Sequence, residues 1–552
     1  MVEVYKKIST IVSDYIATMY PNKQKMIIGA LNHLLGERIS YYKFVKSDFI
    51  RSHADLQNEL YNLNEKSEQR KNKGVYYTPE DVCKYIIWNS ITMMLEPNNN
   101  RTYKESDAID KIVAYPTDTI TTLLTKKKFF DPTCGSGEFL INVFKIKYAI
   151  MRTKTQNHTD NEIYYISKTI YGNDIDKNST DISKIRLFFE ICQHVANPQY
   201  YSLIAKTLNK QFTNIDYVIY NGQFDNTFDC IVGNPPYVEY GKFENKESLQ
   251  NNYGNIYADV IKNSIITLKQ TGVFGFIIPL SYISTSRMSN IRNFVINTTD
   301  RQFILNFGDR PDCLFQGVHQ KLNILIGRKG RKEHKLFTSN YKHWYKEERK
   351  ILLNGCEIKE NHYHNNTFIP KIGNGIEDGI YKKITTSSKN NLFDQQNEKG
   401  FPLYLNMRAC FWIKAFTFNP GSNEYKIFNY DERYPFIYCI LNSSMFWLYW
   451  TIMSDCWHIT TKELKGFYLP TITAEDCKDF EILSKNLEDK LESTKKFIGT
   501  KQVDYEYKHK DCKNEIDIID EKLAQIYELT NEEIHYIKNY ALKYRLGSGA
   551  DG

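Results

Sequence analysis

Short apolar runs alternate with longer amphipathic segments between Gly74 and Gly327, and this alternation constrains the fold more strongly than any other feature of the sequence. The apolar runs occur in KKFFD, TIYGND, FDCIVGN and GVFGFIIPL. Short strands that alternate with helical segments are typical of a sheet whose strands are largely parallel. We therefore expect an α/β fold in this part of the chain.

The sequences that flank this central part have a different character. Residues 1–68 place apolar residues at helical spacing and end in a charged linker, which predicts a helical region. Residues 329–470 are rich in aromatic residues and short strands, whereas residues 471–546 are charged and helical in pattern. We expect four regions with these boundaries, the central one covering residues 69–328.

Composition argues against several classes of protein. No apolar run approaches the roughly 18 residues that span a bilayer, and the N-terminus lacks the layout of a signal peptide. The 11 cysteines contain no CxxC pair, which argues against a disulfide framework and against a structural metal site. We therefore expect a cytoplasmic protein with reduced thiols and no membrane partner. The net charge of +7 is compatible with an anionic partner but does not establish one.

A glycine-rich turn follows the first apolar run, in DPTCGSGEFL. Gly135 and Gly137 let the backbone approach a ligand closely, and the helix that follows offers N–H groups to it. The spacing matches neither GxGxxG nor GxxxxGK[ST], so a dinucleotide or nucleoside triphosphate site is not indicated. A nucleotide-like ligand and a merely tight turn remain the two interpretations.

Two acidic residues follow the second apolar run, in TIYGNDID. An acid at the end of the second strand of an α/β unit is placed to bind ribose hydroxyls. Asp174 and Asp176 are both candidates, and one of them is expected to cap the next helix instead.

Two consecutive prolines end the next apolar run, in FDCIVGNPPY. They stop the strand and hold Asn234 and the Pro235 carbonyl in one geometry at the carboxyl edge of the sheet. An exocyclic amine on an aromatic base is a poor nucleophile, and two acceptors aimed at its hydrogens would draw it toward tetrahedral geometry. Asn234 and Pro235 supply those two acceptors, and Tyr237 can stack on the base.

In their order along the chain, these motifs resemble those of the gamma-class, TaqI-like adenine-N6 DNA methyltransferases of the long-chain type. The series is GVYYTPEDV, DPTCGSGEFL, GNDID, FDCIVGNPPY, NIYADVI, GVFGFIIPLSY and LFQGV. The resemblance implies a Rossmann-like S-adenosylmethionine-dependent methyltransferase domain over residues 69–328. It also implies a mixed α+β target-recognition domain over residues 329–470 and C-terminal helices over residues 471–546.

The resemblance implies roles for individual residues as well. S-adenosylmethionine is expected to contact Tyr77, Thr78, Asp131, Pro132, Cys134, Gly135, Gly137, Phe139, Asp174 and Asn234. The target adenine is expected to contact Asn234, Pro235, Pro236, Tyr237 and Phe315, with Tyr237 and Phe315 on its two faces. No metal is expected. Seen alone, Phe315 would be a core residue and Thr78 a helix cap.

One position departs from the family pattern. Where the family has an Asp that reads the adenine amine of the cofactor, the best match here is Gln223, in NGQFDN. A carboxamide oxygen can accept the same hydrogen bond. Asn221 and Asp225 remain alternatives.

The resemblance implies methyl transfer to the N6 amine of an adenine flipped out of duplex DNA, as in a restriction-modification system. An RNA or protein-glutamine methyltransferase with the same NPPY site is the alternative, although roughly 200 residues after the central domain favour a DNA-reading module. A non-catalytic DNA-binding subunit is a third reading, against which the intact motifs argue.

Double-stranded DNA is thus the expected partner, and a monomer the expected state. Basic and aromatic residues interleave between Arg328 and Lys350, which favours phosphate contacts over a merely solvated face. The segment WHITTKEL, with Lys462 and Lys465, is a second candidate for DNA contact. The N-terminal residues show no nuclease motif, so a cognate restriction endonuclease would be a separate protein.

Overall fold

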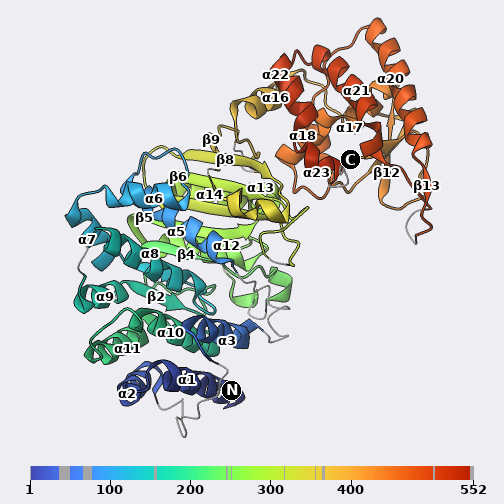
Figure 1. Cartoon of the computed structure of the whole chain (residues 1–552). Coiled ribbons are helices and arrows are strands. Elements are labelled where there is room, and N and C mark those ends of the chain that lie inside the picture. Colours follow the sequence, from blue (N-terminus) through green and yellow to red (C-terminus); the bar gives the residue numbers. More distant parts are fainter. Residues whose placement is uncertain are drawn as a thin grey trace.

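The computed structural model describes residues 2–36, 50–65, 78–154, 158–243, 246–249, 251–315, 317–354, 356–363, 367–500 and 504–547. Figure 1 shows N-terminal helices at one end, a large central sheet with its helices, and a C-terminal region at the other end.

Nine strands form the central sheet, in the order β3-β2-β1-β4-β5-β7-β6-β8-β9. They are β1 (Phe129–Asp131), β2 (Ile170–Asn173), β3 (Phe212–Thr213), β4 (Phe228–Gly233), β5 (Leu268–Pro279), β6 (Thr299–Phe307), β7 (Leu322–Lys329), β8 (Lys335–Lys342) and β9 (Lys359–Glu360). The neighbours from β3 to β5 and the pair β6–β8 are parallel, whereas β7 is antiparallel to β5 and β6. The sheet is therefore mixed and mostly parallel, in agreement with the alternating sequence pattern.

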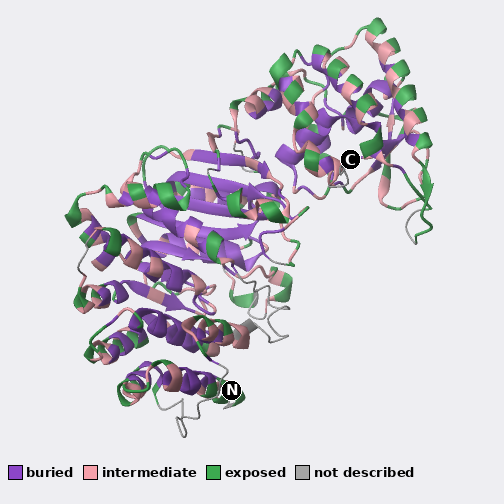
Figure 2. Cartoon of the chain, in the orientation of Figure 1, coloured by how far each residue is buried: buried purple, intermediate pink, exposed green. Residues whose placement is uncertain are grey.

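Both faces of the sheet are covered, because successive side chains of a strand point to opposite sides. Phe129 and Val232 belong to one hydrophobic cluster, whereas Phe130 and Ile231 belong to another. The burial in Figure 2 shows the sheet as the core of this part of the chain. Its helices are α5 (Glu80–Leu95), α6 (Glu105–Val113), α7 (Thr117–Thr125), α8 (Glu138–Lys154), α9 (Asp160–Ser167), α10 (Lys177–Cys192), α11 (Gln199–Gln211), α12 (Ile256–Thr267), α13 (Ser281–Ser284) and α14 (Ser289–Thr298).

Among the described N-terminal residues, three helices lie outside α10 and α11 (Figure 1). They are α1 (Val2–Met19), α2 (Gln24–Leu35) and α3 (His53–Glu65). Their apolar residues, among them Ile16, Leu31 and Leu56, are buried in the same cluster as Phe129. The N-terminal helices are therefore packed onto the central domain as an additional layer.

The C-terminal region combines helices with a three-stranded sheet of order β11-β10-β12. Its elements are α15 (Arg349–Leu352), α16 (Gly375–Thr386), β10 (Gln396–Asn406), β11 (Ala415–Phe416), β12 (Tyr425–Tyr430), α17 (Tyr434–Asn442), α18 (Ser444–Met453), α19 (Thr461–Gly466), α20 (Ala474–Ser493), β13 (Lys496–Phe497), β14 (Tyr505–Glu506), α21 (Lys513–Ile526), α22 (Asn531–Asn539) and α23 (Leu542–Leu546). Strands β8 and β9 belong to the central sheet, so the boundary expected at residue 328 falls inside that sheet.

Within the described ranges, no single helix is long and apolar enough to cross a membrane, although α17 and α18 together pass by length and composition as a pair bent by 63°. In the same part of the chain, no three His, Cys, Asp or Glu side chains come together as a metal site.

Candidate active site

Four loops that carry candidate residues meet at one edge of the sheet. They follow β1, β2, β3 and β4, which are all parallel to their neighbours in this half of the sheet. The carboxyl ends of parallel strands lie at the same edge, where open α/β sheets bind their ligands. The sheet therefore brings together residues that are about 100 positions apart in sequence, such as Asp131 and Asn234.

The glycine-rich turn after β1 needs both of its glycines, for different reasons. Gly135 and Gly137 have φ values of +51° and +86°, in the left-handed region that side chains disfavour. A Cβ at Gly137 would lie 2.3 Å from the Ser183 hydroxyl oxygen, whereas a Cβ at Gly135 would meet no atom within 4 Å. Gly137 therefore allows α10 to pack against the turn, and Gly135 faces open space.

The two acids after β2 have separate roles. Asp174 accepts a hydrogen bond from the Gly135 N–H at 2.8 Å, so its carboxylate lies against the turn. Asp176 is the N-cap of α10 and accepts hydrogen bonds from the N–H groups of Asn178 and Ser179 at 3.4 and 3.1 Å. The structure thus resolves the alternative that the sequence left open, with Asp176 as the cap and Asp174 at the turn.

Asn173 joins the loops after β1 and β3, a role that sequence reasoning missed. Its side chain donates to the carbonyl oxygens of Pro132 and Ile215 at 2.9 and 3.1 Å, and its Oδ1 accepts from the Ile215 N–H at 3.0 Å. Asn173 is only 1% exposed. An amide at the end of a buried strand, next to the candidate Asp174, was the available sequence signal.

Asp131 connects the glycine-rich turn with the Asn234 loop. Burial raises the pKa of Asp131 well above its usual range, and the nearby charge of Asp174 adds to this rise. The Thr133 N–H donates to Asp131 Oδ1 at 3.0 Å. A Cβ at Gly233 would lie 2.7 Å from the same oxygen, so the glycine before Asn234 makes room for Asp131.

The Asn234 loop itself lies next to the glycine-rich turn. The Thr133 hydroxyl donates to the Asn234 carbonyl oxygen at 3.5 Å, and Pro235 is buried. The Tyr237 hydroxyl donates to the Ile277 carbonyl oxygen at 3.0 Å, and its half-buried ring meets Tyr257 edge-on at 6.3 Å. The loop is thus anchored on β5 at one end and on the turn at the other.

The remaining candidates differ in what the structure says of them. Tyr77 lies outside the described residues. Thr78 is 5% exposed, and the N-cap of α5 is Pro79 instead of Thr78. Cys134 and Phe139 are 5% and 3% exposed within the hydrophobic core.

Phe315 has the burial of a core residue, at 2% exposure. Its loop joins β6 to β7 and therefore lies at the same carboxyl edge as the Asn234 loop. The Cys313 thiol donates to the Phe315 carbonyl oxygen at 3.0 Å, and Phe315 pairs with Val318 in a short antiparallel bridge. The position at the edge fits the expected role, although the ring is packed into the cluster.

Gln223 does not lie with the other candidates, and the prediction that placed it there is corrected. It is exposed in the turn that leads into β4. Just after it, the Thr227 N–H donates to the Thr267 carbonyl oxygen at 2.9 Å, at the beginning of β5. Gln223, with its alternatives Asn221 and Asp225, therefore belongs to the opposite edge of the sheet.

Asp216 is an acidic residue that lies at the carboxyl edge, where Gln223 was expected to lie. It follows β3 at the carboxyl edge, one strand further out than Asp174. The Asp216 carboxylate accepts from the Val218 N–H at 3.0 Å, and Asn214 donates to the Asp174 carbonyl oxygen at 3.0 Å. The sequence signal was the acid in FTNID, which follows a strand of only two residues.

In the basic segment from Arg328 to Lys350, for which the sequence favoured phosphate contacts, Arg331, Lys332, Lys346 and Lys350 are exposed, whereas three other residues are engaged within the protein. Arg328 is 8% exposed and donates twice to Asp300, at 2.9 and 2.6 Å. Trp344 is 1% exposed, and Arg349 donates twice to Asp81, at 2.7 and 2.9 Å. These residues stabilise the sheet and its neighbours instead.

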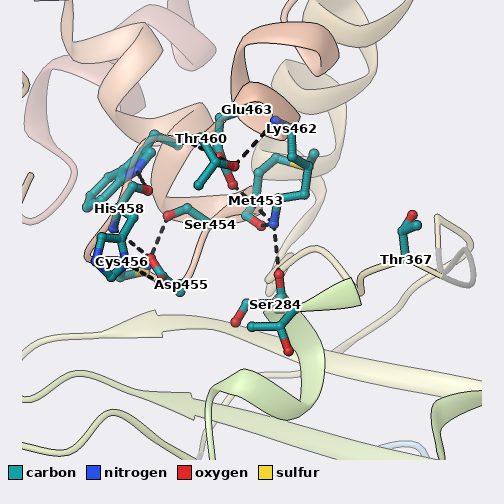
Figure 3. Close-up of polar contacts among 12 residues, drawn as sticks. Ser284, Thr367, Met453, Ser454, Asp455, Cys456, His458, Thr460, Lys462 and Glu463 are labelled. Carbon is teal, nitrogen blue, oxygen red and sulfur yellow. Dashed lines mark hydrogen bonds and ion pairs between the residues drawn. The ribbon is translucent and has the colours of Figure 1, made fainter. Parts of the chain in front are cut away.

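The segment WHITTKEL is held in a fixed conformation between the two halves of the molecule (Figure 3). Lys462 donates to the carbonyl oxygens of Ser284 in the central domain and Met453 in the C-terminal region, at 2.9 and 3.0 Å. Asp455 accepts from the N–H groups of Trp457 and His458 at 2.9 and 2.7 Å. Lys462 is therefore an anchor at the junction, and Trp457 is partly exposed.

Comparisons with known proteins agree with this geometry. Residues 168–313 match the family described as Eco57I restriction-modification methylase. The chain is 24% identical over 332 residues to the type II restriction enzyme and methyltransferase RM.Eco57I of Escherichia coli, which covers 52% of this chain and 31% of that protein. It is 24% identical over 269 residues to the type II methyltransferase M.VspI of a Vibrio species, covering 48% of this chain and 50% of that protein.

A solved structure shares the fold over nearly the whole chain. The type IIL restriction-modification enzyme MmeI, solved in complex with DNA, has a TM-score of 0.54 and 12% identity, covering 96% of this chain and 92% of that one. The matched part of the present chain spans half or less of the length of the two curated relatives. Residues 168–313 are thus similar to the Eco57I restriction-modification methylase family.

Proposed function

We propose that the chain transfers a methyl group from S-adenosylmethionine to the N6 amine of an adenine flipped out of duplex DNA, within a restriction-modification system. The observation that carries this proposal is the contact between the Asn234 loop and the glycine-rich turn, through Thr133 and Asp131. A methyl donor held by the turn would lie next to an amine held by Asn234 and Pro235. Such proximity supplies much of the rate of a direct transfer.

The residues at the edge fit a nucleoside cofactor. Gly135 faces open space, and the carboxylates of Asp174 and Asp216 lie on adjacent loops beyond it. Carboxylates accept hydrogen bonds from ribose hydroxyls and from an exocyclic adenine amine. We assign Asp174 to the ribose and Asp216 to the adenine amine of the cofactor. When bound, S-adenosylmethionine supplies an electrophilic methyl group.

Asn234 and Pro235 act on the acceptor amine. The Asn234 carboxamide oxygen and the Pro235 carbonyl oxygen each accept a hydrogen bond from the acceptor amine. These two hydrogen bonds draw the nitrogen lone pair out of conjugation with the ring. Tyr237, held by its hydrogen bond to Ile277, stacks on the base, and Phe315 is the candidate for the other face. No covalent intermediate would be needed, because the amine would take the methyl group directly, the broken S–CH3 bond would leave the cofactor sulfur as a thioether, and the amine would lose a proton during or after the transfer.

Duplex DNA is the favoured substrate because Arg310, Lys321 and Trp457 lie together at the same edge. Lys321 precedes β7, whose first residue pairs with the carboxyl ends of β5 and β6. Lys321 and Arg310 lie 4.7 and 5.3 Å from the Trp457 ring centre. Lys321 pairs with Asp309, whereas no carboxylate of the described residues lies within ion-pair distance of Arg310. We assign Arg310 and Trp457 to contacts with DNA next to the flipped base.

The test is transfer of labelled methyl from S-adenosylmethionine to mixed-sequence duplex DNA, followed by mass spectrometry of the digested nucleosides. We expect N6-methyladenine from the wild type and a loss of at least about 100-fold in turnover for Asn234→Ala, because one of the two acceptors is gone. Cofactor binding should be largely retained in this variant.

Other outcomes have definite meanings. Unchanged turnover of Asn234→Ala would contradict the assigned site. Label that enters RNA or protein glutamine in parallel reactions, with no label in DNA, would support the alternative substrate classes, which share the same NPPY chemistry. Label in cytosine would place the chain outside the adenine-specific enzymes.

A further inference from the structure

Helix α10 lies between the glycine-rich turn and the N-terminal helices (Figure 1). All of its residues from Ser179 to Cys192 are buried. Two of them, Ser183 and Arg186, are three residues apart and therefore lie on the same face of the helix. Ser183 packs against Gly137, as described above, and Arg186 contacts the next part of the turn.

Arg186 binds the glycine-rich turn with two of its donors. Its Nη1 donates to the Ser136 carbonyl oxygen at 2.7 Å, and its Nη2 donates to Glu138 Oε2 at 3.0 Å. The arginine side chain is 6% exposed. Ser136 lies between the two glycines, so Arg186 is hydrogen-bonded to the centre of the turn.

The third donor of Arg186 points to the N-terminal helices. Its Nε donates to Gln57 Oε1 at 2.8 Å, and Gln57 Nε2 donates back to the Arg186 carbonyl oxygen at 3.0 Å. The Tyr61 ring of the same helix α3 lies 5.5 Å from the guanidinium carbon. A reciprocal pair of hydrogen bonds thus fixes the rotamer that Arg186 uses to reach the turn.

A second contact keeps α3 in register with α10. His53 Nε2 forms a hydrogen bond with Glu190 Oε2 at 2.9 Å, and the Tyr15 hydroxyl reaches His53 Nδ1 at 3.0 Å. His53 and Gln57 are four residues apart on α3, as are Arg186 and Glu190 on α10. The two helices therefore meet through matched polar pairs, one turn apart on each helix.

We infer that the N-terminal helices brace the cofactor turn, and that Arg186, supported by Gln57, is a positioning residue for cofactor binding. This inference rests on the proposed function, since it assigns the turn to the cofactor. The rigid guanidinium fork binds Ser136, Glu138 and Gln57 through three separate nitrogens in one plane, whereas a lysine offers a single nitrogen. The N-terminal region, which has no motif of its own, thereby acquires a role in the reaction.

The test uses the full-length chain and compares Arg186→Met, Arg186→Lys and Gln57→Leu, with Arg152→Met as the control. Arg152 is an exposed arginine in the last turn of α8. Two quantities are measured: the dissociation constant of S-adenosylmethionine by calorimetry, and hydrogen exchange of a peptide that covers residues 131–140, without cofactor. The N–H groups of Gly135 and Gly137 are hydrogen-bonded in the turn, so their exchange reports directly on its rigidity.

We expect Arg186→Met to raise the dissociation constant at least about tenfold and to speed exchange in the 131–140 peptide. Arg186→Lys should fall between this variant and the wild type, and Gln57→Leu, which leaves the turn contacts in place, should raise the constant about threefold. Combining Arg186→Met with Gln57→Leu should add little, because both act through one contact. Arg152→Met should match the wild type.

Unchanged affinity and unchanged exchange in a folded Arg186→Met or Gln57→Leu protein would overturn the inference, even if the unfolding midpoint fell. A wild type that binds no S-adenosylmethionine would contradict the proposed function instead. In that case the exchange measurement, which needs no cofactor, would still decide whether Arg186 and Gln57 hold the turn.

Discussion

The carboxyl edge of the central sheet and the C-terminal region use their polar residues differently. At the edge, Asp131 ends β1, and Asp174 and Asn234 directly follow β2 and β4, so the backbone places them. At the junction with the C-terminal region, Lys371, Lys462 and Arg292 instead donate to main-chain carbonyls. The place of a candidate residue at the end of a strand can therefore be predicted from the sequence, whereas the partner of a basic residue cannot.

The junction shows which carbonyls these basic residues meet. Lys371 donates to the Ser454 carbonyl oxygen at 2.6 Å, and Lys462 donates to that of Met453, so two lysines meet the C-terminal end of α18. From the central domain, Arg292 donates to the Thr367 carbonyl oxygen at 2.6 Å. Each of these contacts removes a positive charge from the set that could meet DNA phosphates.

The largest expected effect comes from a change in the glycine-rich turn at the carboxyl edge. Gly137→Ala places a side chain at φ +86° and within 2.3 Å of the Ser183 hydroxyl oxygen. We expect the free energy of unfolding to fall by at least about 2 kcal/mol, from backbone strain and overlap together. Cofactor binding should be lost as well. Urea unfolding and calorimetry measure the two effects.

Gly135→Ala is the matched control, because a methyl group there meets no protein atom within 4 Å. Only the strain at φ +51° remains, so the stability loss should be smaller, about 1 kcal/mol. The methyl group would enter the space assigned to the ligand, and cofactor affinity should still fall. Equal stability losses in the two variants would contradict the packing argument.

A smaller effect is expected from a change of Arg310, and it tests the difference between arginines with and without a carboxylate partner. Arg310→Gln should weaken binding of duplex DNA about fivefold and reduce the salt slope by about 1, because a phosphate contact is lost. Arg433→Gln is the control, since Arg433 already pairs with Asp431 at 2.7 Å. Fluorescence anisotropy at several salt concentrations measures both. Equal losses in the two variants would remove the case for Arg310.

The smallest effect concerns stability in the C-terminal region. Burial raises the pKa of Glu377 to about 7, although its carboxylate accepts from the Tyr536 hydroxyl at 2.5 Å and the Gly373 N–H at 2.7 Å. A raised pKa favours the protonated folded form, so stability should be lost as the pH rises from about 4.5 to 7. In Glu377→Gln this part of the pH dependence should disappear.

Denaturant unfolding at pH 5 and pH 8 of both proteins isolates this contribution, because all other groups titrate alike. From pH 5 to pH 8, the unfolding free energy of the wild type should fall relative to that of the variant. A difference that does not change with pH would show that Glu377 ionises as freely in the folded protein as in the unfolded chain.

The sequence predicted most of the edge because local rules decide it. The strands before Asp131 and Asn234 are apolar and end abruptly, and glycines or prolines mark each turn. Gln223 was misplaced because β3 has only two residues, so no apolar run marked the strand that precedes Asp216. The next polar cluster in the sequence, NGQFDN, belongs to the opposite edge, so the position predicted for Gln223 was wrong.

The partners of the basic residues depend on tertiary packing and could not be predicted from the sequence. Nothing in the pattern around Arg328 shows that it faces Asp300, and nothing around Lys462 shows that it reaches the main chain of Ser284. The role of Arg186 was also hidden, since its partners are about 50 and 130 positions away. Such contacts depend on the packing of whole helices, which local spacing does not specify.

The anchors at the junction have a consequence for the exchange of parts between related chains. The bonds that Lys462 makes to Ser284 and that Arg292 makes to Thr367 cross the junction, and each ends on a main-chain carbonyl, which every residue offers. A different C-terminal region that supplies a lysine in place of Lys462 and a carbonyl in place of that of Thr367 would keep both bonds without changes in the central domain. Under the proposed function, the C-terminal region could thus be exchanged while the central domain stays as it is.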